Sequence, residues 1–342
     1  MNIGNREINQ NSDPLIIAEI GINHNGSLKV AKEMVDSAKR AGVEVIKHQT
    51  HIVEDEMSSE AKKVIPGNST KSIYEIMKNA ALNYEEELEL KDYVENKKMI
   101  FISTPFSRAA VDRLVKMNVP AFKIGSGECN NHPLIEYICK FNKPVILSTG
   151  MNDLISVRKS VKILEDYKID YSLLHTTNLY PTPHNLVRLG GMQALMNAFP
   201  DIPIGLSDHT TDNLSSYAAI SLGASIIERH FTDTYERSGP DIICSMDEAN
   251  CKELITNSKL IKSMLGGEKV PAKEEKVTID FAFATVVSIK EIKKGEILDS
   301  NKIWVKRPGT GEIKAEFYNS IIGKKALKNI KKDKHLNWTD FE

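Results

Sequence analysis

Two short apolar stretches of the chain end in side chains that can bind a metal ion. The first ends with Ser207 and His209, and the second ends with Glu228 and His230. Residues two apart in a strand lie on the same face, so each of these pairs points one way. Two adjacent strands of this kind would bring the two imidazoles together at one end of a sheet. The pattern therefore predicts half of a divalent metal site, whose other positions stay open for substrate and water.

Two lysines lie in similar apolar runs, Lys47 in residues 44–49 and Lys123 in residues 121–126. The alternation of each run places its lysine on the face opposite the helices. A lysine in such a position is costly unless it meets an anion. The ends of neighbouring runs add hydroxyl and amide donors, and the whole set suits a group the size of a phosphate. These donors are Ser126, Ser148, Asn178 and Ser207.

Other chemistry fits part of this set. Lys47 or Lys123 could be the Schiff-base nucleophile of an aldolase. The histidine pair favours metal-assisted chemistry instead, because a Schiff-base enzyme needs no metal to polarise a carbonyl. A structural role suits each histidine taken alone, but it explains two lysines, two carboxylates and two histidines together less well. The remaining polar residues at run ends are Glu19, Gln49, Thr104, Glu128 and Tyr180.

The elements that must position these residues alternate regularly. Residues 15–22 form a β-type run, and a helical pattern over 27–41 follows, starting at the capping residue Ser27 and stopping before Gly42. Repeated units of this kind predict a parallel sheet, and eight of them predict a closed (β/α)₈ TIM barrel with its chemistry at the carboxyl ends of the strands. A doubly wound open sheet would need a G-x-G-x-x-G turn, which residues 21–26 do not form. The runs span residues 15–22, 44–49, 99–106, 121–126, 144–149, 171–178, 203–209 and 226–231.

The domain organisation follows from a change in composition. Residues 1–267 carry the barrel pattern, residues 268–280 are charged and are typical of a linker, and residues 281–342 predict a small, mainly irregular domain. The lysines of this second domain fit a solvated surface better than an anion site. Within the barrel, residues 50–82 predict a long polar loop, and a loop of that length beside a strand end is usually functional.

Bulk composition excludes several classes of protein. The 342 residues carry a net charge of −1 without a basic stripe, so we expect no nucleic-acid partner. No apolar run approaches the roughly 20 residues that cross a membrane, and the polar first 13 residues do not resemble a signal peptide. The four cysteines form no C-x-x-C pair, which disfavours a disulfide framework and a thiolate zinc site. A cytoplasmic location fits best.

Longer motifs resemble the sialic acid synthase family, and the resemblance covers essentially the whole chain. The tail containing WVKRPGTG (304–311) resembles its antifreeze-protein-like (SAF) domain, and GPDIICSMD (239–247) is similar to the bacterial N-acetylneuraminate synthase branch. The other motifs are EIGINHNGS (19–27), KHQTHIVEDEMS (47–58), STPFSRAA (103–110), FKIGSGECNN (122–131), LSTGMN (147–152), HTTNLYPTP (175–183), GLSDHT (205–210) and ERHFTD (228–233).

The resemblance implies an activity and its partners. Family members condense phosphoenolpyruvate with N-acetylmannosamine and water, releasing phosphate and N-acetylneuraminate by cleavage of a C–O bond. They use a divalent metal, typically Mn²⁺, with Mg²⁺ or Co²⁺ as alternatives. They form a domain-swapped homodimer in which the SAF domain of one chain covers the barrel mouth of the other.

The resemblance also implies residue roles. The metal ligands match His209 and His230. The phosphoenolpyruvate contacts match Lys47, Lys123, Ser126, Ser148, Asn178 and Ser207, with Thr104 near the substrate carboxylate. The amino-sugar contacts match Gln49, Tyr180 and Asp241, and Arg307 matches a residue that reaches the N-acetyl group from the partner chain. Glu19 and Glu128 are our candidates for orienting or deprotonating the attacking water.

Three alternatives remain open at this point. A sister synthase that uses a diacetamido-trideoxy sugar would give legionaminic or pseudaminic acid with nearly the same site. A binding protein whose working part is the small domain would need neither the inward lysines nor the histidine pair. A Schiff-base aldolase would be trapped by borohydride in the presence of pyruvate.

Overall fold

The computed structural model describes residues 1–66 and 70–342. The chain divides into two compact units, residues 1–266 and residues 267–342. The helices of the described ranges include none with both the length and the apolar composition of a membrane span.

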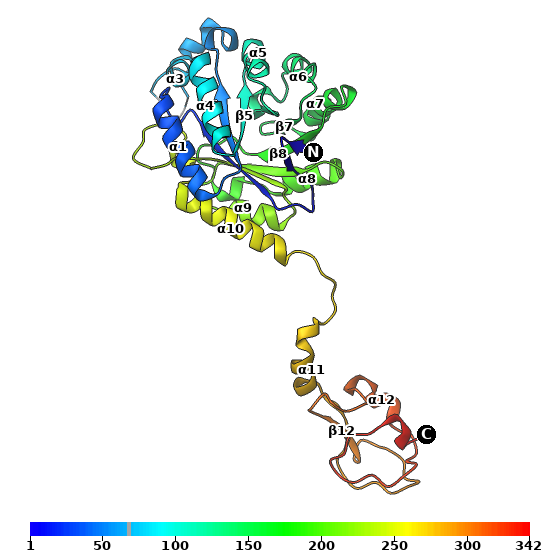
Figure 1. Cartoon of the computed structure of the whole chain (residues 1–342). Coiled ribbons are helices and arrows are strands. Elements are labelled where there is room, and N and C mark those ends of the chain that lie inside the picture. The colour runs from blue at the N-terminus through cyan, green and yellow to red at the C-terminus, as the bar shows by residue number, and fades with distance from the viewer. Residues whose placement is uncertain (67–69) are drawn as a thin grey trace. The chain divides into compact units, whose positions relative to one another are not determined.

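The first unit is a closed barrel of parallel strands surrounded by helices, as Figure 1 shows. Each barrel strand pairs with the next along the chain, and β10 closes the ring against β3. The predicted (β/α)₈ fold is therefore confirmed. The barrel strands are β3 (Leu15–Gly21), β4 (Val45–Thr50), β5 (Ile100–Pro105), β6 (Phe122–Ile124), β7 (Val145–Ser148), β8 (Tyr171–Thr176), β9 (Ile204–Asp208) and β10 (Ile226–His230). The helices of this unit are α1 (Leu28–Ala41), α2 (Val53–Glu56), α3 (Ile73–Ala80), α4 (Tyr84–Asn96), α5 (Arg108–Lys116), α6 (His132–Cys139), α7 (Leu154–Asp166), α8 (Gly190–Ala198), α9 (Leu214–Ser221) and α10 (Glu248–Met264).

Helix α1 illustrates why the helices form where the sequence predicts them. Ser27 caps its start by accepting a hydrogen bond from the backbone N–H of Val30. Gly42 ends it in a left-handed conformation with φ of 94°, which favours glycine, and its N–H bonds the last carbonyls of the helix. The buried side chains recur at helical spacing and pack onto the barrel; they are Ala31, Met34, Val35, Ala38 and Ala41.

Inside the barrel, the side chains form an apolar end and a polar end. On β3, Leu15 and Ile17 face inward, and Glu19 follows on the same face one layer higher. Likewise, Lys47 stands one layer above Val45. The apolar layers form one cluster, made of Leu15, Ile17, Val45, Ile102, Ala121, Ile146, Leu174 and Ile226. The ionisable groups are thereby confined to the carboxyl ends of the strands.

The apolar end is closed by a hairpin that the sequence does not predict. Strands β1 (Asn2–Ile3) and β2 (Arg6–Glu7) pair antiparallel at the N-terminus. Ile3 and Ile8 are fully buried and join the apolar cluster inside the barrel. The predicted polar start of the chain therefore includes part of the core.

The predicted long loop over 50–82 was wrong in its described parts. It contains α2, a 3₁₀ helix (Ser59–Lys63) and α3, while residues 67–69 lie outside the described residues. Helix α3 starts with a capping box, in which Ser72 accepts from the N–H of Glu75 and the Glu75 carboxylate accepts from the N–H of Ser72.

The second unit has its own small core. Strands β11 (Thr285–Ser288) and β12 (Ile303–Lys306) pair antiparallel. The unit also contains α11 (Lys276–Ala282), which begins within the predicted linker, and α12 (Tyr318–Ile321). Its buried residues are Val286, Ile292, Leu298, Ile303, Ile313, Ile321, Ala326, Ile330, Leu336 and Phe341.

Candidate active site

Two buried lysines and two buried glutamates meet in the polar layer of the barrel. Lys47 Nζ contacts the carboxylate of Glu19 and lies 3.5 Å from Glu228 Oε1. Lys123 Nζ lies 3.7 Å from the same Glu228 oxygen and donates to Ser148 Oγ at 2.7 Å. All four ionisable side chains are at most 7% exposed. The charges of the two lysines are therefore compensated inside the barrel by two carboxylates.

This arrangement sets the protonation of each group. Burial lowers the pKa of Lys47, but the carboxylates of Glu19 and Glu228 outweigh burial and leave the pKa above its usual value. Burial dominates at Lys123 and lowers its pKa to about 8, although Glu228 opposes this effect. Burial raises the pKa of Glu228, but the ammonium groups of Lys123 and Lys47 outweigh it and hold the pKa below its usual range.

A cavity of about 340 Å³ opens above this layer at the carboxyl ends of the strands. Its size falls within the range of small-molecule sites. Its lining combines many polar side chains with apolar side chains of α3 and with Phe106. The polar lining consists of Lys47, Gln49, Thr104, Lys123, Ser126, Ser148, Thr176, Asn178, Tyr180, Ser207, His209, Glu228, His230 and Asp241.

The two imidazoles lie together at the rim of this cavity. The ring centroids of His209 and His230 are 5.4 Å apart, and the ring of Tyr180 lies 4.2 Å from that of His209. His209 Nδ1 lies 2.9 Å from the carbonyl oxygen of Thr177, which can only accept a hydrogen bond. The proton of His209 is thus on Nδ1, and the lone pair of Nε2 is available to a ligand.

The chemistry of these residues fits part of a metal site. Burial lowers the pKa of both His209 and His230 to about 4, which keeps the imidazoles neutral, as metal ligands must be. Within the described part of the chain, His230 Nδ1 is buried and has no hydrogen-bond partner, and it lies 3.7 Å from Asp241 Oδ2. The same residues contain no cluster of three or more metal-binding side chains. The pair therefore fits an open site, in which substrate or water completes the coordination.

Comparisons with known proteins agree with this fold. Residues 34–270 match the model of the NeuB family, and residues 283–342 match that of the SAF domain. The chain belongs to the NeuB family. The predicted resemblance, including the C-terminal SAF domain, is thereby confirmed.

Individual relatives of this NeuB-family chain cover nearly its whole length. It is 40% identical to an uncharacterized protein of Methanocaldococcus jannaschii, over 99% of this chain and 98% of the relative. It is 37% identical to an N,N'-diacetyllegionaminic acid synthase of Campylobacter jejuni, over 93% of this chain and 97% of the relative. A crystal structure of the N-acetylneuraminic acid synthetase of Leptospira borgpetersenii, in complex with citrate, superposes with a TM-score of 0.75 at 30% identity, covering 82% of this chain and 94% of that one.

The structure brings most of the sequence-predicted site residues to this cavity, with three exceptions. Glu19 lies beneath the lining, where it pairs with Lys47 and accepts from Gln49 Nε2 at 2.9 Å. Glu128 does not line the cavity, and its carboxylate accepts from Asn131 Nδ2 at 2.5 Å. Arg307 belongs to the second unit of the chain.

Sequence reasoning did not predict how two features contribute to this site. Glu228 Oε1 contacts Lys47, Lys123 and Ser207, so this carboxylate connects the side chains of the polar layer. The apolar wall comes from Ile73, Ile76 and Met77 on α3, in the stretch predicted as a loop. Helical spacing of these three residues, preceded by the S-x-x-E capping pattern, is the signal that could have found it.

Proposed function

We propose that this chain is an N-acetylneuraminate synthase. It condenses phosphoenolpyruvate with N-acetylmannosamine and water, and it releases phosphate by cleavage of the C–O bond. The observation that carries this proposal is the pairing of an anion-binding layer, centred on Lys47 and Lys123, with the neutral histidine pair at the rim of one cavity.

Phosphoenolpyruvate occupies the polar floor in this proposal. Its phosphate and carboxylate need cationic and hydroxyl donors, and Lys123 with Ser148 already form a hydrogen-bonded pair there. Lys47 Nζ lies 3.3 Å from Thr104 Oγ1, which places a second ammonium beside a hydroxyl. Asn178 Oδ1 is buried and has no partner within residues 1–66 and 70–342, and a bound substrate would supply one. Ser126 and Ser207 complete the donor set.

The amino sugar lies above the phosphoenolpyruvate, with its open-chain aldehyde near the histidines. Gln49, Tyr180 and Asp241 are the polar side chains of this part of the cavity. Burial raises the pKa of Asp241 to about 6, so its carboxylate accepts a hydrogen bond from a sugar hydroxyl above that pH. Arg307 of a partner chain reaches the N-acetyl group if the chains exchange their SAF domains. A divalent metal ion, held by His209 and His230 and most readily Mn²⁺, would supply Lewis-acid polarisation of the aldehyde.

Residues of the chain stabilise the charges and accept the protons of the reaction steps. The C2=C3 π electrons of phosphoenolpyruvate form a C–C bond from C3 to the aldehyde carbon. The aldehyde C=O π bond breaks, so its oxygen becomes an alkoxide and positive charge develops at C2. The buried carboxylates of Glu19 and Glu228 stabilise this charge electrostatically. Water adds at C2 and loses a proton to a carboxylate, which passes it to the alkoxide. Of our two candidates for this carboxylate, Glu19 pairs with Lys47 beneath the cavity lining, whereas Glu128 does not line the cavity, although burial raises its pKa. The tetrahedral intermediate then expels phosphate, which leaves against Lys123.

A sister acceptor sugar is the second candidate. The relative named N,N'-diacetyllegionaminic acid synthase is 37% identical over 93% of this chain, and the apolar wall of α3 would also suit a deoxygenated sugar. Such an enzyme keeps the same floor, histidines and order of steps. The acceptor alone differs.

One assay separates these candidates. Phosphate release from phosphoenolpyruvate is measured with Mn²⁺, with N-acetylmannosamine in one series and the diacetamido-trideoxy sugar in another. We expect strong release with N-acetylmannosamine that EDTA abolishes. Release with only the deoxygenated sugar would move the chain to the sister branch. Release with neither sugar would reject the proposed activity.

Two further measurements test the mechanism. Phosphoenolpyruvate labelled with ¹⁸O at the bridging position should pass the label into phosphate, because the C–O bond breaks. The variant His230→Ala should lose metal-dependent turnover. Substantial activity in this variant would reject the metal assignment while leaving the anion site untouched.

A further inference from the structure

A buried ion pair lies directly behind the two histidines. Asp208 precedes His209 and Arg229 precedes His230, and Asp208 and Arg229 are partners in the parallel pairing of β9 and β10. The residues Asp208 and Arg229 are 2% and 1% exposed. Because Ser207 and Glu228 face the barrel interior, these two charged side chains point outward, into the layer between strands and helices.

Asp208 ties the end of β9 to the first turn of α9. Its Oδ2 accepts hydrogen bonds from the hydroxyls of Ser215 and Ser216, each at 2.7 Å. Its Oδ1 accepts from the backbone N–H of Thr210 at 2.9 Å. The backbone on both sides of His209 is therefore held by one carboxylate.

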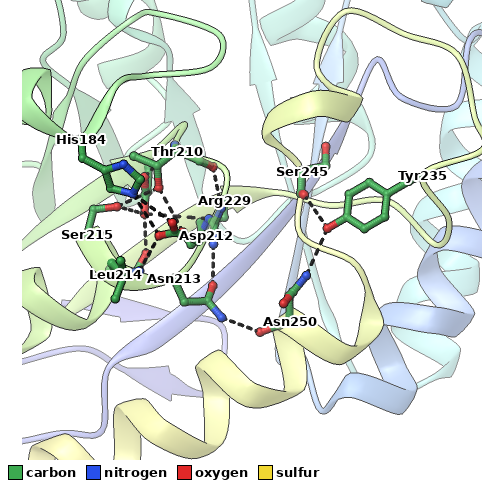
Figure 2. A network of polar contacts seen from close by, with 12 residues as sticks. His184, Thr210, Asp212, Asn213, Leu214, Ser215, Arg229, Tyr235, Ser245 and Asn250 are labelled. Carbon is green, nitrogen blue, oxygen red and sulfur yellow. Dashed lines mark hydrogen bonds and ion pairs between the residues drawn. The ribbon is translucent and has the colours of Figure 1, made fainter.

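Arg229 binds the same turn from the neighbouring strand, as Figure 2 shows. Its Nη1 donates to Asn213 Oδ1 at 2.5 Å, and its Nη2 donates to the carbonyl of Thr210 at 2.7 Å. Its Nε lies 3.9 Å from Asp208 Oδ2. Since the guanidinium carries fixed charge and has little access to water, it depends on these acceptors.

The network continues towards Asp241, which also lines the cavity. Asn213 Nδ2 donates to the carbonyl of Asn250 at 3.0 Å, and Asn250 Nδ2 donates to the hydroxyl of Tyr235 at 3.1 Å. That hydroxyl donates to the carbonyl of Ser245 (Figure 2). Ser245 Oγ in turn donates to the carbonyl of Asp241 at 2.7 Å. One chain of contacts thus links the segments that carry His209, His230 and Asp241.

We infer that Asp208 and Arg229 are positioning residues that fix the two imidazoles for metal binding. This inference rests on the proposed function, in which His209 and His230 hold the metal ion. Neither charged residue reaches the cavity, so each acts through the backbone of its neighbour. Two ligands from two strands bind one ion well only if the strands keep their relative positions. Mutation of a group that orients metal ligands typically lowers the metal affinity by about 10- to 100-fold.

The test is the variant Asp208→Asn in the full chain. It keeps the size of the side chain and an oxygen for the two serines, but it leaves Arg229 buried without its counter-charge. Mn²⁺ affinity is measured by isothermal titration calorimetry without substrates, and the visible spectrum of bound Co²⁺ reports the ligand geometry. We expect Mn²⁺ affinity to fall by at least about tenfold, with a changed Co²⁺ spectrum.

Glu87→Gln is the matched control. Glu87 is a fully buried carboxylate on α4 that pairs with Arg113 at 3.1 Å, and it has no contact with β9 or β10 among the residues that the structure describes. We expect its Mn²⁺ affinity to equal that of the wild type, even if its thermal stability falls as much as that of Asp208→Asn.

The outcomes separate this inference from the metal assignment. Wild-type affinity in Asp208→Asn, or an equal loss in Glu87→Gln, overturns the positioning role alone. A wild-type chain that binds no Mn²⁺ overturns the metal assignment and this inference with it. If Asp208→Asn does not fold, Ser216→Ala removes only one hydroxyl from the carboxylate, and an unchanged affinity there also counts against the inference.

Discussion

The two inward lysines have different electrostatic surroundings. Lys47 lies between the carboxylates of Glu19 and Glu228, which keep it charged. Lys123 has Ser148 as its nearest partner, and burial lowers its pKa to about 8. Lys123 is therefore the cation of the site whose charge changes within the range of ordinary assay buffers.

We expect the affinity for phosphoenolpyruvate to fall as the pH rises above 8. The ammonium form of Lys123 pairs with the bound anion, so binding above its pKa of about 8 requires uptake of one proton. The Kd for phosphoenolpyruvate should then rise by about tenfold per pH unit. Isothermal titration calorimetry between pH 7 and 9.5, without sugar, measures this slope.

Two variants test whether Lys123 causes this pH dependence of the Kd. Lys123→Arg stays charged throughout this range and should bind with an almost constant Kd above pH 8. Glu228→Gln removes the carboxylate that raises the pKa of Lys123, so its loss of affinity should begin at lower pH. A wild-type Kd that stays constant up to pH 9.5 would contradict the assignment of Lys123 to the anion.

At the scale of elements, the turn after β7 has no room for a side chain at Gly150. A Cβ there would lie 1.9 Å from Asn178 Oδ1 and 2.8 Å from Ser126 Oγ. The backbone N–H of Gly150 also donates to Ser126 Oγ at 3.0 Å. Glycine thus lets the turn after β7 approach the side chains that follow β6 and β8.

We expect Gly150→Ala to weaken phosphoenolpyruvate binding by about tenfold, because it displaces Asn178 and Ser126, which our proposal assigns to this substrate. The melting temperature should change little, since Asn178 can rotate away from the new methyl group. Gly190→Ala is the control, because nothing lies within 4 Å of a Cβ at that position. Equal Kd values for the two variants would show that the turn does not shape the anion site.

A second buried network joins β4 to α4 and to the turn after β3. The N–H of Gly26 donates to His24 Nδ1 at 3.2 Å, so the proton of His24 is on Nε2, which lies 3.2 Å from His48 Nε2. His48 Nδ1 in turn donates to Glu87 Oε1 at 3.1 Å. Every proton in this chain of contacts has an assigned place.

This arrangement predicts acid sensitivity. Burial, and next the charge of His48, lower the pKa of His24 to about 3, against 6.5 in an unfolded chain. Between these values the unfolded chain binds the extra proton, so the free energy of unfolding falls by about 1.4 kcal/mol per pH unit as the pH drops. In His24→Gln this contribution is absent, and the stability gap to the wild type should narrow from pH 6 to pH 4.

Urea unfolding of the barrel at several pH values measures that gap. His184→Gln serves as the control, because the side chain of His184 is 52% exposed. A gap between wild type and His24→Gln that is independent of pH would contradict the assigned protonation of the network.

Much of the barrel could be predicted because its signals are local. The strands are short apolar runs in which every second side chain lies on the same face. The helices between them begin and end at capping residues, as α1 does at Ser27 and Gly42. The N-terminal hairpin has no such signal. Its strands are two residues long, and Ile3 and Ile8 are held by burial inside the finished barrel.

The site was predictable in part for the same reason. Parity along a strand shows that Lys47, Lys123 and Glu228 face inward. It does not show that Glu228 lies between the two lysines, because they come from β4, β6 and β10, which meet only when the barrel closes. Residue-level chemistry follows from the sequence, whereas the pairing of charges depends on the tertiary structure.

At the scale of the molecule, each unit has its own hydrophobic core. The core of the second unit includes Val286, Ile303 and Leu336, and none of its members comes from the barrel. We therefore expect the barrel, expressed as residues 1–266, to fold alone and to bind phosphoenolpyruvate and Mn²⁺. This isolated barrel should lack turnover if catalysis needs Arg307. Measurements of the Kd values, together with the phosphate-release assay, would separate binding from catalysis.

The proposed exchange of SAF domains between two chains predicts a specific complementation. His230→Ala inactivates a barrel, and Arg307→Ala inactivates a SAF domain, so each variant alone should be inactive. In a mixed dimer with exchanged domains, the intact barrel of one chain receives the intact Arg307 of the other, and an equal mixture should recover about a quarter of wild-type turnover. If Arg307 instead serves the barrel of its own chain, no mixed dimer contains a complete site, and the mixture should recover nothing. Co-expression of the two variants with different tags, followed by the phosphate-release assay, distinguishes these cases. Full activity of Arg307→Ala alone would show that turnover does not need Arg307 in either arrangement.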